Sequence, residues 1–413
     1  MFTLNPIRQA LVPAASDAAQ KLCSPNYDEF QSDGEIYDLL QIQPDSVLKI
    51  TMPHCDVAAR DGILTDGCPE ALEKAGVNMG ALKDSELTKV AENAIFLYEI
   101  VAPYRPDVRQ IGIGGMAQID QIRTDKTPDG IIIRNEGIRE EKAKGRADLI
   151  RSTNAIIGTV NLAIDDKDRA MTDAMLKYAD SRPCDFEAID ETKTQHRIWL
   201  ITDAAEIKTL TDQLAKEPHA YVADGNHRSA AAAMLGTGEF LCVSFPAQLM
   251  GLAPYNRLVD APEVTLAKLE ADLKAQFEVE NLGSVETFQP MEIHEIGIYL
   301  ENTWLKLTPK SSAYDASNAV ESIDSDMVQR HIFDALLGIS DNRDKRLTFV
   351  GGNRDAAYLK QKVDAGHHQL AVTLAPVTIE QFIDVCTQNR IMPPKSTWFQ
   401  PKIRSGLVMA LLG

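Results

Sequence analysis

The chain has 413 residues, 44% hydrophobic and 25% charged, which is the balance of a globular protein with room for two or three domains. Its 42 basic and 60 acidic side chains give a formal net charge of −18, which argues against partners such as nucleic acid or an anionic membrane. No apolar run approaches the ~20 residues that span a bilayer, and the first residues lack a signal-peptide pattern. We therefore expect a cytoplasmic protein.

The six cysteines form neither a C-x-x-C pair nor a Cys/His pattern with the spacing of a zinc site. The adjacent pair His367 and His368 follows a glycine and has no neighbour with metal-ligand spacing. We interpret the cysteines as reduced thiols.

In the first part of the chain, residues 46–52 (SVLKITM) and 93–101 (NAIFLYEIV) predict strands, and prolines follow at 103 and 106. We assign residues 1–105 to an N-terminal segment.

Strand and helix patterns alternate through the middle of the chain, which we assign to a central domain at 106–260. One helix begins at Asp203, whose capping-box partner is Glu206 three residues later. A second begins near His227, in the strong helix former HRSAAAAML. Strands are expected at 110–116, 130–134, 159–164, 197–202, 220–223 and 239–245, and a further helix at 144–156.

The last part, 261–413, predicts a separate C-terminal α/β domain. Its elements are helices at 264–277, 325–337 and 378–388, a hairpin of 295–300 with 303–307, strands at 347–350 and 369–374, and a final apolar strand. The fold class is therefore α/β (α+β), with a mixed-sheet centre and flanking α/β segments.

The segment Asp224-Gly225-Asn226-His227-Arg228 stands where a predicted strand ends and a helix begins. A helix start presents unpaired N–H groups and a positive dipole end, which suit a phosphate. Gly225 lets a ligand approach the backbone, Asn226 and His227 add donors, and Arg228 adds a cationic fork. Asp224 is placed to accept a substrate hydroxyl or to help hold Mg²⁺. The alternative is that Asp224 only caps the helix and Arg228 only forms a surface pair.

Two other segments offer groups for the same chemistry. Asn135 and Glu136 follow a predicted strand, and a carboxylate there can act as a general base or be a solvated strand end. Arg146 lies in a charged helix that is mostly solvated, and is a further candidate for phosphate binding.

A stiff loop near the end of the chain, Lys395-Ser396-Thr397 after two prolines, offers a cation and two hydroxyls for an anionic substrate. Lys402 and Arg404 follow closely and could assist. The alternative is a proline-rich connection anchored in the core by Trp398 and Phe399.

The glycine-rich stretches at 112–115 and 350–352 do not predict a nucleotide site. The first lacks the G-x-G-x-x-G order with a helix starting there, the second is typical of a tight turn, and the chain has no GxxxxGK[ST] P-loop.

Several stretches together resemble the bacterial family called domain of unknown function 1015 over nearly the whole chain. They are SPNYDEF at 24–30, RNEGI at 134–138, HRIWLITD at 196–203, YVADGNHRSAA at 221–231, LAPYNRLV at 252–259, DKRLTFVGG at 344–352 and MPPKSTWFQPKIRSGLV at 392–408.

The strand–DGNHR–helix element also resembles the DGHHR box of the ParB/sulfiredoxin-like superfamily, which includes free serine kinases. That resemblance implies Glu136 as the base on the serine hydroxyl, Asp224 on the hydroxyl or the metal, and His227 with Arg228 on the transferred phosphate. Asn135 and Asn226 replace the two histidines of that pattern, and asparagine carries no charge and exchanges no proton near neutral pH.

Three hypotheses follow for function. The first is a small-molecule phosphotransferase that uses ATP or ADP with Mg²⁺ and acts on the hydroxyl of serine or a related hydroxy acid, in either direction. The second is a non-catalytic regulatory protein that binds a nucleotide or a phosphorylated metabolite. The third is a purely structural or sensory protein with a vestigial site, which the two asparagine replacements favour. The partner in the first two is a small phosphorylated molecule, and self-association into an oligomer stays open.

Overall fold

A computed structural model describes all residues, 1–413, and divides the chain into two compact units. Unit 1 comprises Met1–Arg134, Ile138–Met250 and Pro401–Gly413, and unit 2 comprises Asn135–Gly137 and Gly251–Gln400. The segment expected at 1–105 and most of that expected at 106–260 thus lie together in unit 1. The fold is α+β, as the sequence predicts.

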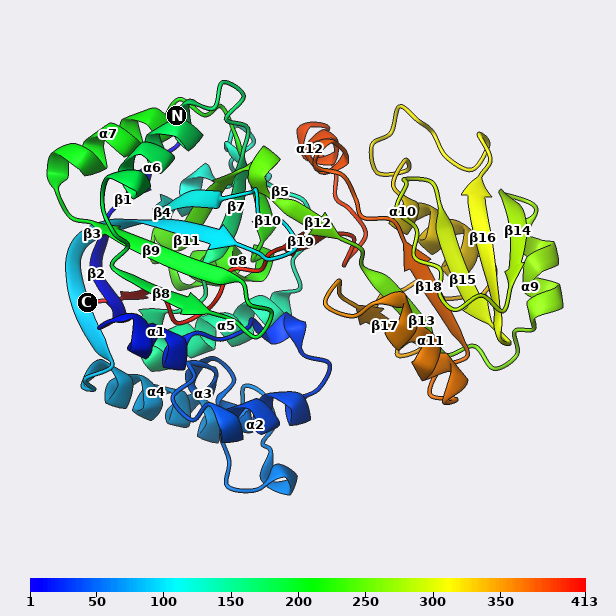
Figure 1. Cartoon of the computed structure of the whole chain (residues 1–413), viewed down its shortest axis with the longest axis horizontal. Coiled ribbons are helices and arrows are strands. Elements are labelled where there is room, and N and C mark those ends of the chain that lie inside the picture. The colour runs from blue at the N-terminus through cyan, green and yellow to red at the C-terminus, as the bar shows by residue number, and fades with distance from the viewer. The chain divides into compact units, whose positions relative to one another are not determined.

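Unit 1 is built on a mixed sheet of 12 strands with the main order β5-β10-β7-β11-β4-β3-β2-β20-β6, while β1 pairs with β4, and β9 joins β3 to β8 (Figure 1). β10 runs parallel to β5, and β11 runs parallel to β7, whereas the other pairs are antiparallel. The strands are β1 (Leu4–Asn5), β2 (Ile7–Pro13), β3 (Thr88–Val101), β4 (Gln110–Gln118), β5 (Ile132–Arg134), β6 (Ala155–Ile156), β7 (Val160–Ile164), β8 (Phe186–Ile189), β9 (Gln195–Ile201), β10 (Ala220–Asp224), β11 (Glu239–Pro246) and β20 (Met409–Leu411).

Helices pack on this sheet through apolar side chains. Met171, Met175, Leu210 and Leu214 of two of the helices join the main core with the strand residues of the sheet. The helices are α1 (Ser16–Leu22), α2 (Asp33–Ile42), α3 (Leu48–Thr51), α4 (Pro69–Lys83), α5 (Glu140–Thr153), α6 (Ala170–Ser181), α7 (Ala204–Leu214) and α8 (Asn226–Leu235), with the short turns η1 (Tyr27–Glu29) and η2 (Pro53–Cys55). The predicted cap of α7 is confirmed, because the Asp203 carboxylate accepts the N–H groups of Ala205 and Glu206.

Unit 2 has a sheet of six strands in the order β14-β16-β15-β18-β13-β17, and a two-stranded ribbon of β12 with β19. The predicted hairpin of β15 (Ile296–Leu300) with β16 (Thr303–Pro309) is confirmed. The other elements are β12 (Gly251–Ala253), β13 (Asn256–Val259), α9 (Leu266–Leu273), β14 (Phe277–Gly283), α10 (Asp324–Val328), the π-helical turn η6 (Gln329–Asp334), β17 (Leu347–Val350), α11 (Ala356–Asp364), β18 (Leu370–Leu374), α12 (Ile379–Thr387) and β19 (Trp398–Gln400).

The strand predicted at 46–52 is wrong, because this segment forms the short helix α3. Its β-branched side chains favour a strand by local propensity, but Val47, Leu48 and Ile50 are all fully buried in the helical conformation. Burial of three large apolar side chains outweighs the small propensity difference.

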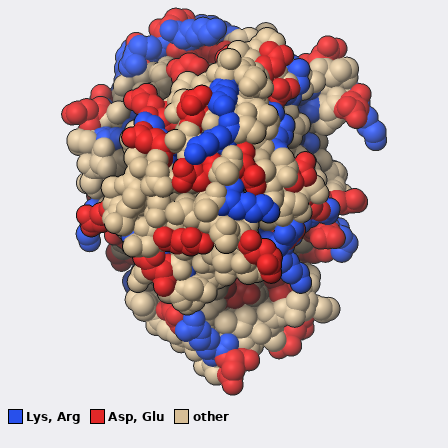
Figure 2. All heavy atoms as spheres, turned by 90° about the vertical axis from the view of Figure 1, so that its right-hand side faces the viewer, with Lys and Arg blue, Asp and Glu red and all other residues tan.

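No helix combines the length and the apolar character that crossing a membrane requires. On the face of the molecule shown in Figure 2, basic and acidic side chains are interspersed among other residues.

Candidate functional site at the start of helix α8

Gly225 fixes the turn between β10 and α8. Its φ of +102° is a conformation that residues with a side chain rarely adopt. A Cβ atom there would also lie 3.0 Å from Nε of Arg228 and 3.2 Å from Cα of Val160. The alanine-rich sequence that follows favours a helix, which ends at Gly236 with φ +67°. The DGNHR segment therefore places Asn226, His227 and Arg228 in the first turn of α8.

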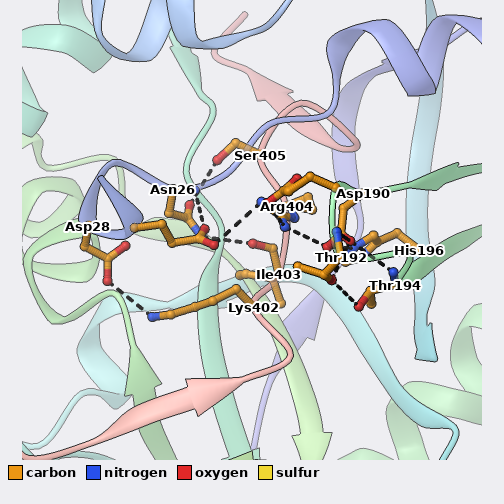
Figure 3. A network of polar contacts seen from close by, with 12 residues as sticks. Asn26, Asp28, Asp190, Thr192, Thr194, His196, Lys402, Ile403, Arg404 and Ser405 are labelled. Atoms are coloured by element: carbon orange, nitrogen blue, oxygen red, sulfur yellow. Dashed lines mark hydrogen bonds and ion pairs between the residues drawn. The ribbon is translucent and has the colours of Figure 1, made fainter. Parts of the chain in front are cut away.

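The carboxylate of Asp224 is held by two cations of the same unit. Its Oδ1 accepts a hydrogen bond of 2.9 Å from Nη2 of Arg228, and its Oδ2 accepts one of 3.0 Å from Nζ of Lys402. Arg228 also donates to the carbonyl of Thr159. Lys402 also pairs with Asp28 at 3.2 Å, as Figure 3 shows. Asp224 and Arg228, which the sequence predicts as ligand contacts, thus contact each other and other residues of unit 1.

His227 faces both the backbone and a cavity. Its Nε2 accepts the backbone N–H of Arg139 at 3.0 Å, which leaves Nδ1 as the protonated nitrogen of the neutral ring. The side chain also lines a cavity of about 430 Å³ within unit 1. This volume is in the range of pockets for small ligands.

The cavity has both cationic and acidic groups on its wall. Lys142 and Arg146 come from α5, and the aromatic rings of Tyr27 and Phe30 come from the SPNYDEF segment. The lining residues are Tyr27, Phe30, Gln31, Ser32, Asp33, Ile36, Thr51, Met52, Pro53, Asp66, Gly67, Leu72, Glu141, Lys142, Gly145, Arg146, Leu149 and His227.

Arg146 is held in place at this cavity. Its Cζ lies 4.2 Å from the centroid of the Tyr27 ring, and its Nη1 donates to the carbonyl of Thr51 at 3.3 Å. Tyr27 and Arg146 also line a smaller cavity of about 60 Å³, of which Arg228 forms another part. Arg146 is therefore a fixed cation beside the first turn of α8.

A buried polar network positions the segment that carries Tyr27 (Figure 3). Asn26 donates to the carbonyl of Ile403 at 2.9 Å and accepts from the Ser405 hydroxyl at 3.1 Å. Arg404, which lies between Ile403 and Ser405 in the sequence, has only 3% of its side chain exposed. It pairs with Asp190 at 2.6 Å and with Glu191 at 2.8 Å. The charges of Lys402 and Arg404 are thus paired with carboxylates of unit 1.

The same network shifts the ionisation of its members. Burial lowers the pKa of His196, whose Nδ1 lies 2.9 Å from the Tyr98 hydroxyl and whose Nε2 lies 3.1 Å from Asp190. Burial by itself would raise the pKa of Asp190, but the hydrogen bond from His196 and the charge of Arg404 together lower it. Burial raises the pKa of Glu29 to about 7, against the opposing charge of Arg404.

Asn135 and Glu136 belong to unit 2, as does the Lys395-Ser396-Thr397 loop. The carbonyl of Asn135 accepts the N–H of Met392 at 2.9 Å, which connects the two segments. Within the loop, the Ser396 hydroxyl donates to the carbonyl of Pro393 at 2.6 Å and accepts from Ser325 at 2.8 Å.

The other residues of this loop also pack within unit 2. Nζ of Lys395 lies 5.3 Å from the centroid of the Tyr255 ring, and Thr397 is half-buried. Trp398 and Phe399 are buried next to it, as the alternative interpretation of the loop expects.

A group of side chains that the sequence did not single out lies beside the cavity. Donor atoms of Asp33, His54 and Cys55 all lie within 4.8 Å of one another. His54 and Cys55 are adjacent in sequence, whereas the usual sequence patterns of metal sites have other residues between their ligands. No such pattern therefore points to this group. Burial and the charges of Asp33 and Asp66 raise the pKa of the Cys55 thiol to about 12, so it does not act as a free thiolate nucleophile.

Comparisons with known proteins give one family and a few distant structures. Residues 4–328 match the family described as "Protein of unknown function (DUF1015)". No curated protein matches the sequence significantly.

The solved structures that match are distant. A conserved hypothetical protein from Pyrococcus furiosus is 12% identical, with a TM-score of 0.37, over 70% of this chain and 92% of that one. A free serine kinase in complex with AMP is 11% identical, with a TM-score of 0.38, over 69% and 86%. SbnI from Staphylococcus aureus is 8% identical, with a TM-score of 0.36, over 70% and 82%.

Proposed function

Because the chain belongs to the DUF1015 family, whose description names no activity, we propose its function from its own residues: unit 1 binds a phosphate-bearing small molecule, a nucleotide in the first place. One observation carries this proposal. His227 in the first turn of α8 and the cations Lys142 and Arg146 of α5 line the same cavity of about 430 Å³.

Elementary electrostatics favours a phosphate at this place. The N-terminus of a helix carries a partial positive charge and points N–H groups outward, and Gly225 adds no side chain in front of them. A guanidinium such as that of Arg146 binds phosphate oxygens in a fork, and Lys142 adds a point charge. The net charge of −18 makes such local cations necessary for any anionic ligand.

We further propose that the protein is a small-molecule phosphotransferase acting on the hydroxyl of serine or a related hydroxy acid, with Glu136 as the general base. This chemistry depends on positioning and charge neutralisation, to which a carboxylate base and fixed phosphate contacts contribute. Gly225, Asn226 and His227 of unit 1 would contact the phosphates. The ParB/sulfiredoxin-like character of the central part stays a prediction.

Asp224 does not fit a Mg²⁺ site in this arrangement, because Lys402 and Arg228 hold its two oxygens. We therefore propose that Asp224 and Arg228 position the start of α8. This pairing, together with Asn135 and Asn226 in place of two histidines, favours a second candidate function, a regulatory protein that binds the ligand without turnover.

Phosphorus NMR of the purified chain with ATP or ADP, Mg²⁺ and a mixture of amino acids distinguishes the two. Nucleotide consumption that depends on a hydroxy amino acid supports the phosphotransferase. Binding without turnover supports the regulatory function, and absence of nucleotide binding contradicts both.

Glu136→Gln tests the assignment of the base. We expect turnover to fall by at least ~100-fold, the lower range of general-base contributions, with nucleotide affinity unchanged. Glu140→Gln, at an exposed carboxylate on α5, is the matched control and should change neither quantity. An equal loss of turnover and affinity in Glu136→Gln would assign Glu136 a structural role instead.

A further inference from the structure

We propose that Asp33, His54 and Cys55 bind a divalent transition-metal ion of the zinc class beside the cavity of unit 1. The inference does not rest on the proposed function, since the three side chains and their spacing are independent of any phosphate.

The spacing of the donor atoms fits one metal ion. Nε2 of His54 lies 3.3 Å from Oδ1 of Asp33, and the donor atoms of all three residues lie within 4.8 Å of one another. Zinc binds nitrogen and oxygen at about 2.1 Å, which places two donors of a tetrahedral site about 3.4 Å apart. The His54–Asp33 distance therefore already matches that of two ligands sharing a metal.

His54 provides the second, independent observation. Its side chain is 0% exposed, and neither ring nitrogen has a hydrogen-bond partner. Buried polar groups in proteins are nearly always paired, because leaving one unpaired costs its full desolvation free energy. A metal ion bound to Nε2 would give that nitrogen the partner it lacks.

Asp66 lies where its carboxylate can orient the ring of a metal-bound His54. Its Oδ1 lies 3.5 Å from Nδ1 of His54, on the opposite side of the ring from Asp33. A histidine that binds a metal through one nitrogen usually donates its other N–H to a carboxylate. Asp66 and His54 are arranged in this way, and the 3.5 Å between them would have to shorten slightly to form a hydrogen bond.

Short, packed elements hold the ligands. Asp33 is the first residue of α2, and His54 and Cys55 lie on η2. Cys55 belongs to a small apolar core with Ile36 and Leu40 of α2. The carbonyl of His54 accepts the N–H of Leu64 at 3.0 Å, which ties the loop that leads to Asp66 to the same place.

The donor set selects the class of metal. Mg²⁺ and Ca²⁺ prefer oxygen ligands alone, whereas imidazole and thiolate suit zinc and its neighbours in the first transition series. Three protein ligands leave a fourth coordination position for water or a ligand, as in catalytic zinc sites. Asp33 and Asp66 also line the cavity that His227 lines, so a ligand in the cavity would lie near this position.

Cobalt titration of the full-length protein, stripped of metal with a chelator, tests the proposal. We expect one equivalent of Co²⁺ to give a thiolate-to-cobalt charge-transfer band, which Zn²⁺ then abolishes by displacement. Cys55→Ser should remove the band, and His54→Gln and Asp33→Asn should weaken Zn²⁺ binding at least 100-fold in competition with a chromogenic chelator. Asp66→Asn should weaken it about 10- to 100-fold.

Matched controls separate the site from other thiols and carboxylates. Cys68→Ser removes a half-buried cysteine nearby, and Asp38→Asn removes an exposed carboxylate on the same helix α2. Both should bind Co²⁺ like the unaltered protein. Asp33 has 54% of its side chain exposed, so Asp33→Asn leaves the fold intact even if variants at the buried His54 and Cys55 unfold.

Two results would overturn the proposal. One is an unaltered protein that gives no thiolate band and binds no stoichiometric Co²⁺ or Zn²⁺. The other is binding that Asp33→Asn and Cys55→Ser leave unchanged. Neither measurement contains nucleotide, so a failure of phosphate binding would not affect them.

Discussion

Lys402 and Asp224 form an ion pair of 3.0 Å between Nζ and Oδ2, although 178 positions separate them in the chain. Lys402 also contacts Asp28, 374 positions away, at 3.2 Å. One lysine thus connects the end of the chain, the SPNYDEF segment and the strand end in front of α8. We infer that these segments fix the cavity wall as a unit.

Loss of this lysine should destabilise the fold. Lys402→Met leaves two largely buried carboxylates without their shared cation, and we expect the free energy of unfolding to fall by about 3 kcal/mol. Urea unfolding measures the change. Lys208→Met is the control, because Lys208 and Asp212 form an exposed pair of 2.7 Å and should contribute less than ~1 kcal/mol. Equal effects of the two substitutions would contradict the role of Lys402.

Gly225 and Gly236 flank the same helix and make a matched pair. Gly236→Ala introduces a side chain at φ +67° with open space around it, so we expect a loss of about 1 kcal/mol in thermal or urea unfolding. Gly225→Ala adds contacts of 3.0 Å with Arg228 and 3.2 Å with Val160, and should cost about 3 kcal/mol. The idea that only glycine fits between β10 and α8 fails if Gly225→Ala is the milder change.

The pKa of Glu29, raised by burial to about 7, makes stability depend on pH. Between pH 4.5 and 7 the folded state then binds more protons than the unfolded state, so the free energy of unfolding falls as pH rises, by on the order of 3 kcal/mol. Glu29→Gln should remove this part of the slope in urea unfolding at pH 5 and pH 7.5. A slope that stays the same would show that Glu29 ionises normally in the fold.

Arg146 should contribute to ligand affinity. A charge-assisted hydrogen bond to phosphate is worth about 1.5–3 kcal/mol, so Arg146→Met should weaken ATP binding about 10- to 100-fold in calorimetry. Arg151 lies on the same helix, with 65% of its side chain exposed, and pairs with Asp148. Arg151→Met should bind ATP normally, and a comparable loss in both variants would point to the general charge of α5 rather than to the cavity.

Local signals in the sequence predicted much of the fold. Asp203 with Glu206 marked the start of α7, and the alanine-rich run HRSAAAAML marked α8, because caps and alanine-rich helices are encoded within a few residues. The hairpin of β15 and β16 was predicted for the same reason. The helix at 48–51 was missed because its apolar residues are placed by distant parts of the core.

The candidate site was predictable only in part. The DGNHR segment was recognised from its strand–helix context, but the pairing of Asp224 with Lys402 depends on residues that meet only in the folded chain. The sequence suggested Lys402 and Arg404 as substrate contacts because carboxylates that pair with them, Asp224 and Asp190, lie more than 170 positions away and cannot be recognised from the sequence. His54 was missed because the carboxylates of Asp33 and Asp66 approach its ring only in the folded chain.

The most direct test of a phosphate-bearing ligand at α8 is an NMR titration of the protein labelled with ¹³C at the histidine Cε1 position. The chain has eight histidines, and His227→Gln assigns the signal of His227. We predict that ATP shifts the His227 signal in a saturable way and leaves those of His294 and His331 in unit 2 in place. An ATP titration that leaves the His227 signal unmoved would contradict the proposed site.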